Sequence, residues 1–201
     1  MPCAPGGVPV AVSSIEIKAY DRLPDDLREA ARALARASFR DPDATDEERA
    51  ENRDRFSAQG DAFKLIVAVR AGEVVGFAVA YRRQIRFAGW PIVLGGIGDV
   101  CVSPDLRRQG VATRLTLSAI DELKWAGCDV AYLCARLDKP GLTELYGRAG
   151  FRRLQYGHTY LGRSGRRYVD QDGMIAPVLS QQLFEAIMVQ PEPFDIGQGN
   201  W

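Results

Sequence analysis

The stretch DVCVSPDLRRQGVA, residues 99–112, changes within a few positions from a strand pattern to a helix pattern. An apolar run ends at Val102, Pro104 turns the chain, and Arg107 and Arg108 precede a glycine that opens a long amphipathic segment. The first N–H groups of a helix lack internal partners and lie at the positive end of its dipole. This stretch therefore predicts an anion site between a strand and a helix.

The predicted helix covers residues 109–126 and ends at Gly127, a C-cap candidate. Its apolar side chains share one face: Ala112, Leu115, Ala119, Leu123 and Ala126. Gly110 lets a pyrophosphate approach the backbone closely, and the two arginines add positive charge. By itself the stretch fits a plain strand-to-helix turn with solvated arginines equally well.

A second segment, LYGRAGF at residues 145–151, lies one helix and one strand later. It places Tyr146 in a short helix that Gly150 ends. Acyl transfer from a thioester needs a proton for the departing thiolate, and a phenol, whose pKa of about 10 lies above that of a thiol at about 8.5, still carries its proton at neutral pH and is a candidate donor. Tyr146 is therefore a candidate general acid, and the alternative is a half-buried core aromatic.

The rest of the chain reads as strands interrupted by helices. Strands are predicted at 14–20, 63–70, 74–85, 92–102 and 130–134, and helices at 25–39, 47–56, 109–126 and 142–149. Residues 156–161 and 174–179 read as a closing hairpin around the turn at 163–167, and residues 190–201 as irregular. Three consecutive strands with short turns imply an antiparallel meander, so the class is α+β or mixed α/β.

Both motifs together resemble the GNAT superfamily of acetyl-CoA-dependent N-acetyltransferases, over about residues 63–161. The acetyl-CoA motif of that superfamily, [Gln/Arg]-x-x-Gly-x-[Gly/Ala], stands here as Arg107 to Ala112, and its Leu-Tyr-x-x-x-Gly-Phe element as Leu145 to Phe151. The resemblance implies a mixed, mostly antiparallel twisted sheet of about six or seven strands with about four helices. It places that domain at 14–180, between a flexible tail at 1–13 and a C-terminal tail at 181–201.

The resemblance also implies the chemistry: acetyl transfer from acetyl-CoA to an amine of a small molecule, by direct attack in a ternary complex and without a metal. Pantetheine would lie where the strand ending at Val102 splays from the strand at 130–134. The implied acid is Tyr146, and the implied cofactor-binding residues are Val100, Cys101, Val102, Arg107, Arg108, Gln109, Gly110, Val111 and Ala112.

The general base is less directly indicated. An ammonium must lose its proton before it attacks, and a carboxylate is the usual acceptor. Asp99 matches a carboxylate position common in the superfamily, although a structural hydrogen-bonding role at a strand irregularity fits equally. His158, the only histidine, is the second candidate.

Within the superfamily the chain resembles aminoglycoside 2'-N-acetyltransferases. The segment at 75–89, the acidic run at 41–48 and the Asp/Gly-containing end all have counterparts there. The resemblance implies that Asp41, Asp43 and Trp201 contact the acceptor. A glutamate of those enzymes is Gly98 here, and the carboxylate is shifted by one residue to Asp99.

Composition limits the other functions. The 201 residues carry 26 acidic and 26 basic side chains, so the net charge gives no reason to expect a nucleic-acid or membrane partner. The four cysteines, Cys3, Cys101, Cys128 and Cys134, form no C-x-x-C pair, which argues against a metal site and against a disulfide framework. Free cysteines favour a location in the reducing cytoplasm. Two alternatives to acetyl transfer stay open: a CoA-binding regulatory module without catalysis, and an acyltransferase for longer acyl chains. A homodimer is also open.

Overall fold

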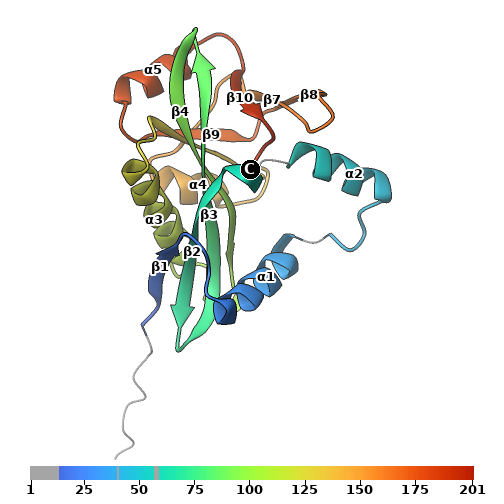
Figure 1. Cartoon of the computed structure of the whole chain (residues 1–201), viewed down its shortest axis with the longest axis vertical. Coiled ribbons are helices and arrows are strands. Elements are labelled where there is room, and N and C mark those ends of the chain that lie inside the picture. Colours follow the sequence, from blue (N-terminus) through green and yellow to red (C-terminus); the bar gives the residue numbers. More distant parts are fainter. Residues whose placement is uncertain (1–13, 40, 57–58) are drawn as a thin grey trace, which may run out of the picture.

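A seven-stranded sheet, in the order β1-β2-β3-β4-β5-β9-β6, forms the centre of the protein (Figure 1). The structure is a computed structural model that describes residues 14–39, 41–56 and 59–201, so the tail predicted at 1–13 lies outside the described residues. The strands of this sheet are β1 (Glu16–Tyr20), β2 (Ala62–Arg70), β3 (Glu73–Phe87), β4 (Trp90–Val102), β5 (Val130–Cys134), β6 (Arg152–Arg153) and β9 (Gly173–Pro177).

Antiparallel pairs dominate this sheet. Strands β1 to β4 form a continuous antiparallel meander, β4 and β5 are parallel, and β5, β9 and β6 are antiparallel again. The parallel step requires a crossover, and α3 supplies it between β4 and β5. The predicted class, a mixed and mostly antiparallel sheet flanked by helices, is confirmed.

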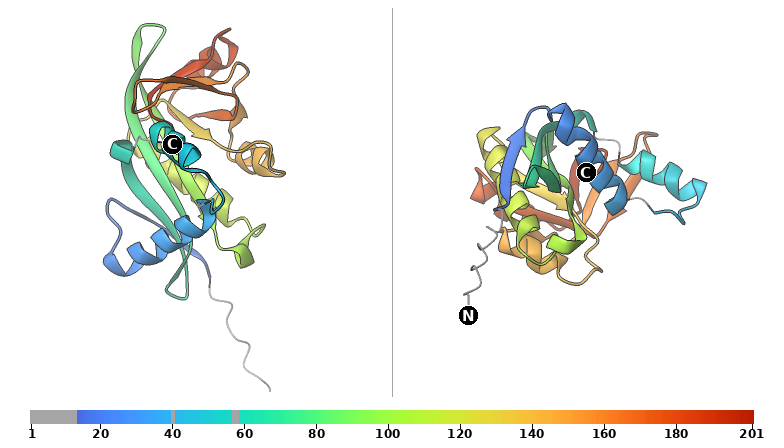
Figure 2. Two further views of the ribbon diagram at one scale, coloured as in Figure 1. Left: turned by 90° about the vertical axis from the view of Figure 1, so that its right-hand side faces the viewer. Right: turned by 90° about the horizontal axis from the view of Figure 1, so that it is seen from below.

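Helices cover both faces of the sheet. They are α1 (Asp25–Phe39), α2 (Asp46–Arg55), α3 (Val111–Trp125), α4 (Leu142–Arg148) and α5 (Gln181–Val189), with short 3-10 turns η1 (Gln59–Asp61) and η2 (Pro104–Leu106). Figures 1 and 2 show α1 and α3 on opposite sides of β2 and β3. Within the described ranges, no helix is both long enough and apolar enough to cross a membrane.

The alternation of side chains along β3 explains this layering. Phe77, Val79 and Tyr81 face the cluster that contains α1, whereas Ala78 and Ala80 face the cluster that contains α3. Successive residues of a strand point to opposite faces, and both sets are buried here. The small alanines therefore lie on the face of α3, and the larger side chains of Phe77 and Tyr81 lie on the face of α1.

A second sheet corrects two expectations about the C-terminal part. Its strands are β7 (His158–Leu161), β8 (Arg167–Asp170) and β10 (Phe194–Gln198), in the order β10-β7-β8. The predicted hairpin partner of β7 was wrong: β8 pairs with it across the turn, while β9 pairs with β5 in the main sheet. The strand β9 is buried over Gly173 to Ala176, and this apolar run fits a central strand better than an exposed hairpin.

The segment predicted as irregular, 190–201, is instead partly ordered as β10, parallel to β7. Its short alternation of buried Phe194 and Ile196 with exposed Asp195 lies close after two prolines, which hid the pattern. The helix α5 before it is capped by Ser180, whose hydroxyl accepts a hydrogen bond from the Leu183 N–H. The C-terminal segment therefore returns to the body of the fold.

Candidate active site

The parallel strands β4 and β5 pair over only three positions. Leu94, Gly95 and Gly96 align with residues 130–132, and in the described part of the chain no further ladder pair joins the two strands. Strand β4 continues to Val102, while β5 remains paired with β9 to Cys134. The backbone edge of residues 97–102 that faces β5 is thus left without a strand partner, at the place where the sequence predicts the cofactor.

Asp99 lies at a β-bulge in β4. The register changes between the pairs Val79 with Gly98 and Phe77 with Cys101, so two residues of β4 face one of β3. Asp99 has a φ of 53°, and its carboxylate accepts a hydrogen bond of 3.0 Å from the Tyr81 hydroxyl. The bulge therefore directs this carboxylate toward the aromatic face of the sheet.

The surroundings raise the pKa of Asp99. Asp99 as a whole residue is exposed, but protein atoms packed around its carboxyl group raise the pKa of that group. The hydrogen bond from Tyr81 lowers the pKa by a smaller amount. Burial and the neighbouring Asp99 also raise the pKa of the Tyr81 phenol, which remains a hydrogen-bond donor. A carboxylate with a raised pKa is a stronger base than one in water.

The start of α3 offers backbone N–H groups. Gly110 at the N-cap has a left-handed φ of 78°, and among the described residues no side chain caps this end of the helix. A Cβ on Gly110 would meet no described atom within 4 Å, so the space beside this residue is open. Arg107 and Arg108 are exposed beside it. These features are what an anion site at a helix N-terminus requires.

Tyr146 lies in α4 and is 8% exposed. Its ring packs edge-to-face on Phe151, with centroids 6.3 Å apart. Burial, with a smaller contribution from Cys134, raises the pKa of the Tyr146 phenol to about 12. The group therefore keeps its proton near neutral pH, as a general acid must. Tyr146 belongs to the same buried cluster as Val102 of β4 and Leu133 of β5, the strands that diverge here.

Trp201 packs on the glycines of β4. A Cβ on Gly96 would overlap its indole ring, and a Cβ on Gly98 would lie 3.3 Å from its carbonyl carbon and 3.0 Å from Tyr81. Residues two apart in a strand share a face, so both glycines leave room for the same aromatic group. On the opposite face, a Cβ on Gly95 would lie 2.8 Å from Leu123 of α3. These glycines have a packing role, and they form no nucleotide-binding loop.

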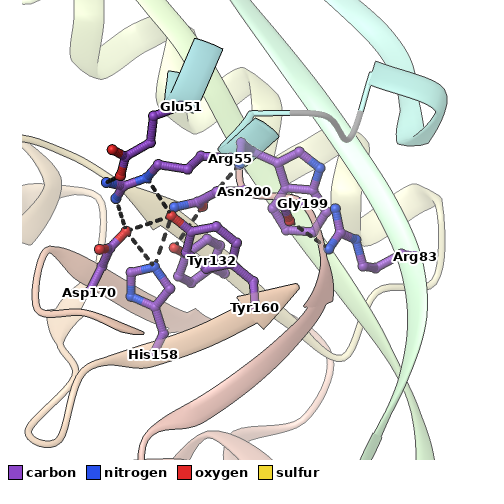
Figure 3. Close-up of polar contacts among 10 residues, drawn as sticks. Glu51, Arg55, Arg83, Tyr132, His158, Tyr160, Asp170, Gly199 and Asn200 are labelled. Atoms are coloured by element: carbon purple, nitrogen blue, oxygen red, sulfur yellow. Dashed lines mark hydrogen bonds and ion pairs between the residues drawn. The ribbon is translucent and has the colours of Figure 1, made fainter. Parts of the chain in front are cut away.

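A polar network beside Trp201 joins α2 to the second sheet (Figure 3). Arg55 forms an ion pair with Asp170 and donates a hydrogen bond of 2.8 Å to the Tyr160 hydroxyl, which in turn donates to Asp170 at 2.8 Å. The Asn200 backbone N–H donates to the Arg55 carbonyl at 2.8 Å. The Asn200 side-chain oxygen accepts a hydrogen bond of 3.0 Å from Tyr132. The end of α2 is thus fixed to the C-terminal segment.

Three residues of this region form a potential ligand set for a metal. One ligand atom from each of Cys134, His158 and Asp170 lies within 4.8 Å of the others, and Zn²⁺ accepts such donors. However, Asp170 already binds the guanidinium of Arg55, which supplies the positive charge that a metal ion would bring. Burial also raises the pKa of the Cys134 thiol to about 11, so the thiolate form is disfavoured. We therefore assign no metal here.

His158, the second candidate for the base, is fully buried. Burial lowers the pKa of its imidazole to about 4, with a partly compensating effect of Asp170. Its ring stacks on Tyr160 with centroids 5.7 Å apart, and Nε2 lies 3.3 Å from the Asn200 side-chain nitrogen. The residue is a neutral packing element of the network, whereas Asp99 is an exposed residue.

The residues predicted to contact the acceptor lie in different environments. Asp41 and Asp43 are exposed, and the Asp41 carboxylate accepts a hydrogen bond from the Asp43 N–H. Trp201 is 7% exposed, with Tyr81 stacked on its ring and the Arg83 guanidinium over it. The structure therefore brings Trp201 next to Asp99 through Tyr81, and it leaves the two aspartates on the surface before α2.

The family comparison agrees with this arrangement. The family described as acetyltransferase (GNAT) domain matches residues 19–154, well over half of the chain. This chain belongs to the GNAT acetyltransferase family. The matched region of the GNAT domain contains the diverging strands, the bulge at Asp99, the start of α3 and Tyr146.

Solved structures share the GNAT fold at low sequence identity. A GNAT family N-acetyltransferase, YhbS, from Escherichia coli in complex with CoA is 17% identical, with 96% of this chain and 93% of that chain covered and a TM-score of 0.57. The ribosomal-protein-S18-alanine N-acetyltransferase from Escherichia coli is 21% identical, with 81% and 94% covered and a TM-score of 0.53. A chain of the NatC complex bound to Gag peptide and CoA is 18% identical, with 81% and 98% covered and a TM-score of 0.55. No curated protein sequence matches the GNAT domain described here.

Sequence reasoning missed several residues that shape this site. Tyr81 and Arg83 lie in a strand that was predicted correctly, but nothing in its pattern shows which distant residue they contact. Gly96 and Gly98 did carry a signal, because two glycines with a spacing of two in an apolar strand indicate a close packing partner on one face. The partner, Trp201, is about a hundred residues away in sequence and could not be identified from spacing.

Proposed function

We propose that this GNAT domain transfers an acetyl group from acetyl-CoA to an amine of a small molecule, by direct attack in a ternary complex. The observation that carries the proposal is the first turn of α3, which no described side chain caps, together with the unpaired edge of β4 that precedes it in the chain. In this proposal the N–H groups of residues 108–112 bind the diphosphate with Arg107 and Arg108. The free backbone groups of Val100 to Val102 pair with pantetheine as an added strand would. The CoA bound to YhbS supports this choice of cofactor.

Two side chains then handle the protons. The acceptor binds as an ammonium, and Asp99 takes its proton directly or through one water, which is favoured by the raised pKa of its carboxyl. The amine attacks the thioester carbonyl, and the tetrahedral intermediate collapses with loss of the CoA thiolate. Tyr146 donates its phenolic proton to the leaving sulfur. Because burial raises the pKa of the phenol above that of a thiol, this transfer alone is unfavourable, and it is offset by the second proton of the former ammonium, which leaves the nitrogen as the amide forms and returns the phenol to its neutral form.

For the acceptor we propose a polycationic amine, with aminoglycosides as the first class to test. Support comes from the acidic side chains of residues 41–48, which are exposed on the segment that enters α2. Trp201 supports the proposal by its position, since it closes the aromatic face next to Asp99. Because Tyr81 and Arg83 already cover its ring, its proposed effect is to shape the acceptor site. Cytoplasmic localisation remains a prediction from the cysteines.

An acetyl-transfer screen tests the proposed function. Purified protein with acetyl-CoA is offered aminoglycosides, polyamines and amino acids, and products are identified by the mass of one added acetyl group. A second series replaces acetyl-CoA by longer acyl-CoA thioesters. Acetylation of an amine by the wild type supports the proposal. Binding of CoA with no acylated amine would instead identify a non-catalytic CoA-binding module, and a preference for longer thioesters would correct the donor.

A further inference from the structure

The side chain of Arg83 in β3 holds the C-terminal segment at several points. Its Nη1 donates hydrogen bonds of 2.7 Å to the Ile196 carbonyl and 2.9 Å to the Gly199 carbonyl. Its Nε donates to Asp61 at 2.9 Å, and its Nη2 forms an ion pair with the same carboxylate at 2.7 Å. The side chain is only 8% exposed. A planar guanidinium can make all these contacts at once, whereas an ammonium cannot.

The same guanidinium lies over the indole of Trp201, with its carbon 3.9 Å from the ring centroid (Figure 3 shows Arg83 beside Gly199). Trp201 also stacks on Tyr81 and packs at 5.9 Å from the ring of Tyr132. Since Gly96 leaves no room for a Cβ beneath the indole, the ring position is defined from several sides. Arg83 thus determines where the indole lies relative to Tyr81.

Tyr81 connects this packing to Asp99. Its ring carries the stacked indole, and its hydroxyl donates to the Asp99 carboxylate at 3.0 Å. The backbone of Trp201 also lies next to Gly98, the residue before Asp99. A continuous set of contacts therefore runs from Arg83 through Trp201 and Tyr81 to Asp99, and it does not involve the cofactor motif.

We propose that Arg83 is a positioning residue for Asp99: by fixing Trp201 on Tyr81, it keeps the proposed general base oriented and partly shielded from water. This inference rests on the proposed function for the role of Asp99 as a base. The contact itself is independent of that role, because the geometry holds whether or not an amine is acetylated. Arg83 touches neither Asp99 nor the first turn of α3 in the described residues.

The direction of the effect follows from the groups around Asp99. The Tyr81 hydroxyl of β3 donates a hydrogen bond to the carboxylate, and Cys101 lies two residues further along β4. The charge of Asp61 in η1 raises the pKa of Tyr81. From α1, Ser38 reaches Cys101, and no charged side chain of the described α1 residues pairs with Asp99. Burial is the largest influence on Asp99 and raises its pKa. Release of the indole admits water, so the pKa should fall.

The experiment compares Arg83→Gln with Arg82→Gln. Arg82 precedes Arg83 and is exposed on the other face of β3, where its charge lowers the pKa of Cys128. It is therefore the matched control. The titration of Asp99 is followed by the carbon NMR signal of its carboxyl, which needs no substrate. Trp201 emission is recorded in a background with Trp90→Phe and Trp125→Phe, because those tryptophans are 75% and 88% exposed.

We expect Arg83→Gln to shift Trp201 emission to longer wavelength and to lower the pKa of Asp99 by about half a unit or more. In the acetyl-transfer assay the acidic limb of kcat/KM should move to lower pH by the same amount. Its plateau should fall several-fold, because a weaker base removes the proton less effectively, and the affinity for CoA should stay unchanged. Arg82→Gln should match the wild type in all these measurements. If Arg83→Gln fails to fold, Arg83→Lys, which keeps the charge near Asp61 without the planar fork, should show the same changes at smaller size.

An Asp99 pKa equal in the wild type, Arg83→Gln and Arg83→Lys would overturn the proposal, as would a Trp201 emission that does not respond to either change. A stability loss with an unmoved acidic limb would also overturn it, since that result means a merely structural role. If the wild type acetylates no amine, the proposed function fails, while the NMR titration and the emission still decide whether Arg83 positions Asp99.

Discussion

The indole of Trp201 stacks on the phenol ring of Tyr81, with ring centroids 5.5 Å apart and ring planes inclined by 23°. Tyr81 lies in the middle of β3, and Trp201 follows β10, so this contact joins two segments that are far apart in sequence. The hydroxyl of the same Tyr81 holds the carboxylate of Asp99. The C-terminal segment therefore belongs to the environment of the proposed base and is more than an appended tail.

Replacing Gly96 by alanine should displace this indole. The added Cβ would overlap the Trp201 ring, so the free energy of unfolding should fall by about 1–3 kcal/mol, as in other overpacked cores. Urea unfolding of Gly96→Ala measures the effect. Gly60→Ala is the control, because its Cβ would meet no described atom within 4 Å, and it should change stability by about 0.5 kcal/mol at most. Equal stabilities of the two variants would contradict the packing described here.

Replacing Asp99 by asparagine should separate activity from stability. The amide can still accept the hydrogen bond from Tyr81 but cannot take a proton, so kcat/KM should fall by about 10²-fold or more. The folded-state pKa of Asp99 lies above its unfolded value, so its ionisation disfavours folding as pH rises through that window. Asp99→Asn should thus have a higher melting temperature than the wild type at pH 7, and this difference should shrink in acid. A lower melting temperature at pH 7 with full activity would remove Asp99 from the mechanism.

Tyr146→Phe should lower kcat by about 10²-fold or more near neutral pH, because the leaving thiolate loses its proton donor. The ring and its edge-to-face contact with Phe151 are kept, so the melting temperature and the CoA affinity should change little. Tyr156→Phe is the matched control, since Tyr156 is 41% exposed and lies beyond α4. Steady-state kinetics decide the matter, and an unaltered kcat in Tyr146→Phe would leave the phenol a packing residue only.

His158 should make folding sensitive to acid. Its folded-state pKa of about 4 lies below the ordinary value of 6.5, so the unfolded chain binds a proton more readily between these values. Stability is therefore complete above pH 6.5 and is lost as pH falls toward 4, by up to about 3 kcal/mol. Urea unfolding at several pH values between 4 and 7 gives the free energy of unfolding as a function of pH. This free energy should depend more steeply on pH in the wild type than in His158→Gln. Identical slopes would mean that the buried imidazole does not titrate in this way.

The sequence alone was sufficient for the central parts of the fold. The long α3 helix and the strands of the meander carry strong periodic patterns, and the two motifs lead to the predictions for the start of α3 and for Tyr146. These features are local, because each depends on residues close together in the chain. For the same reason, the predicted positions of α1, α3, α4 and β5 agree with the structure within a few residues.

The C-terminal third was harder because its structure depends on distant contacts. Strand β9 pairs with β5 and β10 with β7, and strand pairing over long separations leaves no local signature. The network of Arg55 and Asp170 joins residues 115 positions apart, so neither charge could be assigned a partner from the sequence. The acidic run at 41–48 also has a local structural role: Thr45 and Glu48 form a capping box that starts α2, while Asp41 and Asp43 remain exposed.

Calorimetric titration with CoA tests the central claim, that the start of α3 binds the diphosphate of the cofactor, most directly. The wild type should bind CoA with measurable heat and pantetheine, which lacks the diphosphate, much more weakly. Reversing the charges of Arg107 and Arg108 to glutamate should lower CoA affinity by about tenfold or more, while Arg163→Glu, an exposed arginine in the β7–β8 turn, should leave it unchanged. No heat with CoA, or equal affinities for CoA in all three proteins, would contradict the account.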